Sequence, residues 1–151
     1  NCHLAMNPGS YQMKSGLKII KKILPRVHVL LLNKEEAERL VPKKKTIPTL
    51  LGALHKKGES VVLITDGARG SYASNGANIW HMPPYPLKPV AKTGAGDAYR
   101  AGFLTGYLNG ESLKKAGQMG SVTSVYAVEN YGTMNHSYSA SAFKRRLSQT
   151  F

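Results

Sequence analysis

A glycine-rich turn in the second half of the chain has residue types and a spacing that could do chemistry. It reads Thr93-Gly94-Ala95-Gly96-Asp97 and runs into a segment with the pattern of a helix. The two glycines let backbone N–H groups face one side and form a concave anion site, to which the positive end of the helix adds. Asp97, in the first helical turn, can accept a proton from an attacking hydroxyl. Because phosphoryl transfer needs mainly positioning and charge stabilisation, this carboxylate, the anion site and Mg²⁺ suffice for it.

The same residues also have a simpler structural interpretation, in which the glycines make a tight turn and Asp97 only complements the helix dipole. The surrounding sequence excludes two other kinds of phosphate-binding loop. No Gly-Lys-Ser/Thr follows, as in a Walker A loop, and no third glycine stands three residues after Gly96, as in a dinucleotide-binding loop. The chain has only two aspartates, Asp66 and Asp97, so finding one beside a glycine turn favours a functional role.

Segments with strand and helix patterns alternate on both sides of this turn. Val27–Leu32 and Ser60–Thr65 are short apolar runs, typical of strands buried on both faces of a parallel sheet. Residues 71–81 have the pattern of a hairpin with Asn75-Gly76 at its tip. We expect helices between residues 15 and 24, 33 and 41, 46 and 57, 93 and 109, 111 and 129, and 139 and 147. This alternation predicts an α/β fold around a largely parallel sheet.

Two of these helices show stripes that indicate which face is buried. In the helix after the glycine turn, we expect Ala101, Leu104 and Leu108 to lie in the core. The next helix carries a stripe of small residues: Ala116, Gly120, Thr123 and Ala127.

Several motifs, in a fixed order, resemble the ribokinase/PfkB family of carbohydrate and nucleoside kinases. The turn at 93–97 resembles the family signature, and Asn33-Lys34-Glu35-Glu36 is similar to its Asn-x-x-Glu element. Residues 65–70 resemble its Thr-x-Gly-x-x-Gly, and Asn7-Pro8-Gly9 resembles an earlier turn at the end of a strand. The resemblance implies a ribokinase-like three-layer α/β/α fold. It further implies that residues 1–151 are the C-terminal, ATP-binding part of such a kinase, without its lid.

The resemblance also implies roles for individual residues. Asp97 would be the catalytic base, and the amides of Gly94, Ala95 and Gly96 would form the anion hole. Asn33 and Glu36 would hold Mg²⁺, through water. The residues that would line the ATP site are Thr65, Gly67, Gly70 and Thr93. The implied reaction is transfer of a phosphoryl group from ATP to a hydroxymethyl group of a sugar or nucleoside.

The last third of the chain resembles one subset of the family and departs from the family in one place. Residues 97–104, 126–129 and 132–138 look like the bacterial and archaeal nucleoside kinases. Many relatives carry an aspartate that binds a monovalent cation where this chain has Ala91, followed by Lys92. The cation site is therefore in doubt. Lys92 either replaces the charge of the ion, contacts phosphate, or is a solvated loop residue.

Three site residues keep alternative interpretations. Glu36 is either a functional carboxylate or an exposed helix residue paired with Arg39. Asn33 is a helix N-cap, a ligand, or both. Arg100, one turn after Asp97, either steadies that carboxylate or is tied to a neighbouring loop.

Composition bounds the remaining possibilities. The 151 residues carry 21 Lys and Arg against 8 Asp and Glu, a net charge of +13, with one cysteine and five histidines lacking paired zinc spacing. No helix-turn-helix or RRM signature accompanies the lysines, so we expect solvated helix faces and no nucleic-acid partner. We also expect no membrane partner, no secretory signal and a cytoplasmic location, and we leave a homodimer open. The alternative to a kinase is a non-catalytic nucleotide-binding remnant or basic interaction module.

Overall fold

The computed structural model of the chain describes residues 3–58, 60–132 and 135–151. The chain divides into two compact units. The first contains residues 1–66 and 71–81, and the second contains residues 67–70 and 82–151.

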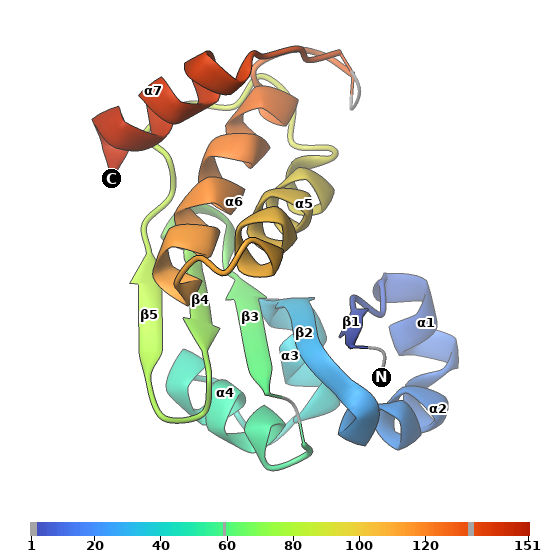
Figure 1. Cartoon of the computed structure of the whole chain (residues 1–151). Coiled ribbons are helices and arrows are strands. Elements are labelled where there is room, and N and C mark those ends of the chain that lie inside the picture. Colours follow the sequence, from blue (N-terminus) through green and yellow to red (C-terminus); the bar gives the residue numbers. More distant parts are fainter. Residues whose placement is uncertain (1–2, 59, 133–134) are drawn as a thin grey trace. The chain divides into compact units, whose positions relative to one another are not determined.

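The first unit is built on a five-stranded sheet in the order β1-β2-β3-β4-β5 (Figure 1). The strands are β1 (Leu4–Met6), β2 (Val27–Asn33), β3 (Val61–Thr65), β4 (Ser71–Ser74) and β5 (Ile79–Met82). β1, β2 and β3 are parallel, and β4 runs antiparallel to β3. The register pairs Asn33 with Thr65, so β2 and β3 end side by side. Both predicted buried strands and the predicted hairpin are confirmed.

Four α-helices and one short 3₁₀ turn accompany this sheet. They are α1 (Ser10–Ser15), α2 (Leu17–Ile23), η1 (Leu24–Arg26), α3 (Lys34–Leu40) and α4 (Ile47–His55). The helix expected between residues 15 and 24 is present as α2, whereas the separate helix α1 before it was not expected. The N–H of Gly16 bonds the carbonyl of Gln12 at 2.7 Å and closes α1 before α2 begins. The lysines of this region are therefore divided between two helices. Lys14 lies on α1, whereas α2 carries Lys18, Lys21 and Lys22.

A core cluster joins these helices to one face of the sheet. β2 and β3 contribute side chains that alternate along each strand, among them Leu30, Leu32, Val62 and Ile64. The helices contribute apolar side chains from every turn that faces the sheet: Met13, Ile20, Ala37, Leu40, Leu50, Leu51 and Leu54. Side chains that point to one face recur every two residues along a strand and about every 3.6 residues along a helix, and both sets fill this core. The packing of the core therefore holds the strands and their ends in position.

The second unit is helical. It contains η2 (Gly67–Arg69), α5 (Ala95–Leu108), α6 (Leu113–Val128) and α7 (Ala140–Thr150). Figure 1 shows α5 and α6 side by side, and their contact is made by small residues. A Cβ on Gly106 would lie 2.9 Å from Cα of Ala116, and one on Gly120 would lie 2.8 Å from the carbonyl oxygen of Tyr99. The small-residue stripe of α6 is therefore the surface that receives α5.

The expected buried stripe of α5 is wrong. Ala101 is exposed and Leu108 is 79% exposed. The buried positions are Tyr99, Gly102, Phe103 and Gly106. α5 turns its glycines inward because close approach to α6 requires positions without a side chain, and this requirement outweighs burial of the leucines.

In the described ranges, no helix is both long enough and apolar enough to cross a membrane.

Candidate functional site

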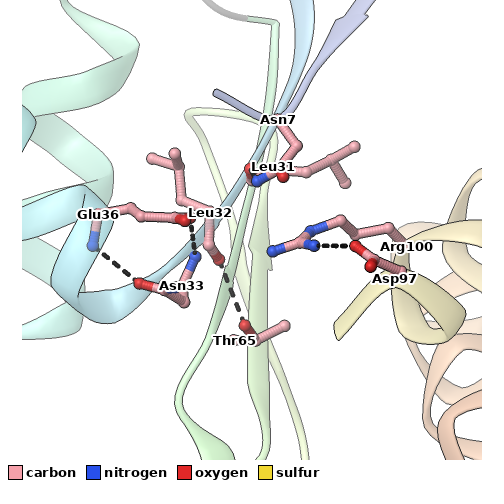
Figure 2. Close-up of polar contacts among 8 residues, drawn as sticks. All are labelled: Asn7, Leu31, Leu32, Asn33, Glu36, Thr65, Asp97 and Arg100. Atoms are coloured by element: carbon pink, nitrogen blue, oxygen red, sulfur yellow. Dashed lines mark hydrogen bonds and ion pairs between the residues drawn. The ribbon is translucent and has the colours of Figure 1, made fainter. Parts of the chain in front are cut away.

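Polar side chains gather where the parallel strands of the first unit end. Asn7 directly follows β1, and its Nδ2 donates to the carbonyl of Leu31 at 2.7 Å. Thr65, the last residue of β3, donates from Oγ1 to the carbonyl of Leu32 at 3.4 Å (Figure 2). Both bonds tie a side chain to the neighbouring strand β2. The carboxyl ends of parallel strands are where α/β proteins bind ligands, and here the polar groups at those ends are held in fixed positions.

Asn33 and Glu36 form a reciprocal capping box at the start of α3. Oδ1 of Asn33 accepts from the Glu36 N–H at 2.8 Å, and Oε2 of Glu36 accepts from the Asn33 N–H at 2.9 Å (Figure 2). Each side chain satisfies a backbone donor that the helix leaves unpaired. The predicted N-cap at Asn33 is confirmed. The alternative of an exposed Glu36 is wrong, since the residue is only 3% exposed.

The side-chain oxygen atoms of this capping box suit a hard cation that keeps part of its water shell. Mg²⁺ prefers oxygen ligands and loses water reluctantly. Asn33 and Glu36 offer one amide oxygen and one carboxylate, and their mutual bonds fix the direction of both. No group of three His, Cys, Asp or Glu side chains suited to a metal occurs in the described part of the chain. Two side chains supply only part of an octahedral set of ligands, so a Mg²⁺ ion held here would keep several of its waters.

An ion pair that the sequence interpretation missed lies at the same strand ends. Nζ of Lys34 is 3.7 Å from Oδ2 of Asp66, whose side chain is only 8% exposed. The two residues directly follow Asn33 and Thr65, which are register partners in β2 and β3. The pairing of β2 with β3 is thus the signal that could have revealed this ion pair. In this register, the residues that follow the two strands, Lys34 and Asp66, become neighbours.

In the second unit, the glycine turn becomes the N-terminus of a 14-residue helix. Gly94 is the N-cap of α5 and has φ +86° and ψ −14°, a left-handed conformation that residues with a Cβ adopt at a cost. The Ala98 N–H bonds the Gly94 carbonyl at 3.0 Å and closes the first turn. By helix geometry, the N–H groups of Ala95, Gly96 and Asp97 have no acceptor within α5 and point out of its positive end. Such a set of donors suits an anion.

Asp97 stands beside these donors and is held by Arg100. Oδ1 of Asp97 accepts from Nη1 of Arg100 at 2.7 Å (Figure 2). The Asp97 side chain is 87% exposed and that of Arg100 is 18% exposed. Of the two interpretations of Arg100, the one that steadies Asp97 is confirmed. Asp97 combines solvent access with a fixed orientation, as a proton acceptor for an incoming hydroxyl requires.

The remaining predicted nucleotide contacts divide between the two units. Thr65 belongs to the first unit, whereas Gly67, Gly70 and Thr93 belong to the second. Thr93 is exposed immediately before Gly94. Gly70 also has a structural reason to be glycine: a Cβ there would collide with the Met82 carbonyl oxygen. Its identity is therefore explained by backbone packing, whether or not it contacts a nucleotide.

Comparison with known proteins assigns the family. The sequence pattern of the pfkB family carbohydrate kinases matches residues 8–140, which is most of the chain. The chain belongs to the pfkB family. The motifs that carried the resemblance lie within the matched residues, except that Asn7 stands one residue before them. The segment 132–138, which pointed to the nucleoside kinases, includes residues 133–134, which lie outside the described residues.

Individual relatives of this pfkB-family chain are sugar and nucleoside kinases. It is 34% identical to a nucleoside kinase of Methanothermobacter thermautotrophicus, over 88% of this chain and 42% of that protein. It is 31% identical to an uncharacterized sugar kinase of Archaeoglobus fulgidus, over 85% of this chain and 51% of that protein. The chain thus spans about half of these relatives, or less.

A solved structure bears out the fold. The crystal structure of the Methanocaldococcus jannaschii nucleoside kinase, described as an archaeal member of the ribokinase family, matches with a TM-score of 0.84 and 27% identity. The match covers 99% of this chain and 49% of that one. The α/β ribokinase-like fold expected from the motifs is therefore confirmed for the pfkB-family chain.

Proposed function

We propose that this chain carries the phosphate-binding and catalytic groups of an ATP-dependent kinase that phosphorylates a hydroxymethyl group of a sugar or nucleoside. The observation that carries the proposal is the start of α5. There, a left-handed Gly94 opens a row of helix N–H donors, and an exposed, oriented carboxylate stands in the first turn. Family membership supports the same reaction class.

The proposed reaction assigns each group one task. The N–H groups at the start of α5 stabilise the negative charge on the transferring phosphoryl group, and Asp97 accepts the proton of the acceptor hydroxyl. Arg100 orients Asp97. Asn33 and Glu36 hold Mg²⁺ through water, and Thr65, Gly67, Gly70 and Thr93 contact the nucleotide. When bound, Mg²⁺ supplies charge neutralisation for the phosphates.

The base is tested by Asp97→Asn in the full-length protein, with phosphoryl transfer from ATP followed in a single turnover. Loss of a general base lowers the rate by about a hundred- to ten-thousand-fold. ATP binding, measured by calorimetry, should change little because the N–H donors remain. Glu111→Gln, an exposed carboxylate outside the proposed site, is the matched control for the charge change. An Asp97→Asn rate within tenfold of wild type would remove Asp97 as the base.

The acceptor is identified with a panel of adenosine, cytidine, ribose and fructose. Relatives named nucleoside kinase and cytidine kinase favour a nucleoside, whereas a relative named fructoselysine 6-kinase keeps a sugar derivative within the proposal. ATP binding without transfer to any acceptor would favour the non-catalytic nucleotide-binding alternative. Salt-sensitive DNA binding without transfer would favour a basic interaction module.

A further inference from the structure

A pocket in the second unit is lined by none of the residues of the proposed kinase site. Its volume is about 460 Å³, which is within the range of sites that bind small molecules. The lining comes from the C-terminal part of α6, the segment 137–139 and one face of α7. Its polar and aromatic residues are Tyr126, Ser137, Tyr138, Ser139, Arg145, Arg146 and Gln149.

The lining of this α7 pocket is positively charged. It contains two arginines and no acidic residue. Arg146 donates to Oε1 of Glu129 at 2.6 Å, and its guanidinium carbon lies 4.2 Å from the centroid of the Tyr126 ring. The hydrogen bond to Glu129 raises the pKa of Arg146, so this guanidinium stays charged at physiological pH. Glu129 balances Arg146, and the exposed Arg145 leaves the pocket with a net positive charge.

Two polar atoms of the lining lack a hydrogen-bond partner. Within the described residues, neither Oη of Tyr126 nor Nη1 of Arg146 bonds to another group, although both are buried. Tyr126 as a whole is only 7% exposed. Buried polar atoms nearly always find a partner in protein or water. Two atoms that have none among the described residues, both on residues that line one pocket, therefore favour a bound ligand. A guanidinium N–H only donates, and a phenol O–H can donate. Both atoms are therefore suited to an acceptor oxygen.

We propose that the α7 pocket binds the oxyanion of a small metabolite, a phosphate or a carboxylate group. Oη of Tyr126 and Nη1 of Arg146 donate to it, and Arg145 supplies the unbalanced positive charge. A charged acceptor makes stronger hydrogen bonds than a neutral one, and it compensates both buried donors at once. This site is separate from the row of N–H donors at the start of α5, so the proposal does not depend on the kinase reaction.

One face of the Tyr126 ring is covered by Tyr138. Tyr138 stacks on Tyr126 with 4.0 Å between ring centroids, and it is 38% exposed. It stands in residues 135–139, a segment without regular secondary structure that leads into α7. Rotation of the Tyr138 side chain would uncover the face of the Tyr126 ring on which it stacks.

The test titrates the chain with inorganic phosphate and, separately, with acetate, at constant ionic strength in chloride. Binding is measured by calorimetry, and its location by backbone amide NMR shifts of residues 137–149 against those of residues 94–97. We expect saturable shifts in 137–149. Shifts with phosphate alone identify a phosphate ester as the ligand, shifts with acetate alone identify a carboxylate, and shifts with both identify either one.

Two variants make the assignment specific. Tyr126→Phe keeps the ring and removes only the unpartnered hydroxyl, so we expect binding about tenfold weaker, the effect of one hydrogen bond to a charged group. Arg145→Gln should weaken binding by about threefold, as is usual for an exposed charge. Arg26→Gln, an exposed arginine of the first unit, is the matched control and should change nothing.

Shifts that grow linearly without saturation, shifts confined to residues 94–97, or equal affinity in Tyr126→Phe and wild type would each overturn the proposal. If the spectrum shows that Tyr126→Phe does not fold, Arg145→Gln decides, because its side chain is exposed and its removal leaves the core intact. Equal affinity in Arg145→Gln would then overturn the proposal in the same way.

Discussion

Arg100 fixes the direction of Asp97: Nη1 of Arg100 donates to Oδ1 of Asp97 at 2.7 Å across one turn of α5. The partners differ in environment. The arginine side chain is 18% exposed and therefore held by its surroundings, whereas the aspartate side chain is 87% exposed. The better-packed residue thus orients the more accessible one, and Arg100 is a positioning residue for the proposed base.

Replacing Arg100 should therefore affect turnover more than stability. An ion pair with so exposed a partner contributes about 1 kcal/mol or less, so Arg100→Gln should change the free energy of unfolding in urea by no more than that. Loss of orientation at Asp97 should lower kcat roughly tenfold and leave KM for ATP nearly unchanged. Arg26→Gln serves as the charge-matched control. Turnover within twofold of wild type in Arg100→Gln would show that Asp97 needs no positioning by this residue.

The capping role of Glu36 can be separated from its charge. Glutamine can also accept a hydrogen bond from the Asn33 N–H, so Glu36→Gln should stay within about 0.5 kcal/mol of wild type in urea unfolding, whereas Glu36→Ala should lose about 1 kcal/mol. If Glu36 also holds Mg²⁺, both variants should need more Mg²⁺ for half-maximal phosphoryl transfer.

The two measurements on Glu36 are independent. An unchanged Mg²⁺ requirement in Glu36→Gln would leave only the structural role of the capping box. A large loss of stability in Glu36→Gln would show that the buried carboxylate has a further partner.

The left-handed conformation of Gly94 predicts that a residue with a Cβ at this position lowers the free energy of unfolding. Gly94→Ala should lower the free energy of unfolding by about 1–2 kcal/mol, because a Cβ is strained at φ +86°. Gly52→Ala is a control of opposite sign. Gly52 lies within α4 with nothing within 4 Å of a Cβ, so alanine should stabilise the chain by about 0.5–1 kcal/mol. If Gly94→Ala and Gly52→Ala changed the free energy of unfolding equally, this would contradict the left-handed conformation of Gly94.

The contact between α5 and α6 gives a fourth prediction. A Cβ on Gly106 would lie 2.9 Å from Cα of Ala116 and 2.9 Å from Sδ of Met119. Because backbone cannot yield as a side chain does, Gly106→Ala should cost about 1–3 kcal/mol in thermal or urea unfolding. Gly52→Ala is again the comparison. A stabilised Gly106→Ala would mean that the two helices are further apart than the structure places them.

Much of the first unit could be predicted because its signals are local. Continuous apolar runs gave β2 and β3, and Asn33 followed by Glu36 contains the whole capping box within four residues. The glycine turn likewise places Asp97 in the first turn of α5. In each case the interacting groups are neighbours along the chain, so spacing alone determines their geometry.

Other features depend on partners that are distant in the sequence. The inward face of α5 was mispredicted because hydrophobicity favoured Leu104 and Leu108, whereas close packing on α6 selected Gly102 and Gly106. The ion pair of Lys34 and Asp66 exists only because β2 and β3 pair in one register. The α7 pocket needs Tyr126 and Arg146 to meet from different helices.

The sequence by itself determined the two buried strands, the hairpin, the N-cap at Asn33, the glycine turn with its carboxylate and, through the order of the motifs, the family. These features follow from backbone conformation and hydrogen bonds between residues a few positions apart. Only the tertiary structure decided that Glu36 is buried and that α5 presents its glycines to α6. It also decided that two buried atoms, Oη of Tyr126 and Nη1 of Arg146, have no hydrogen-bond partner among the described residues. Burial, close approach and unsatisfied polar groups are properties of packed neighbours, and packing joins residues that no sequence spacing relates.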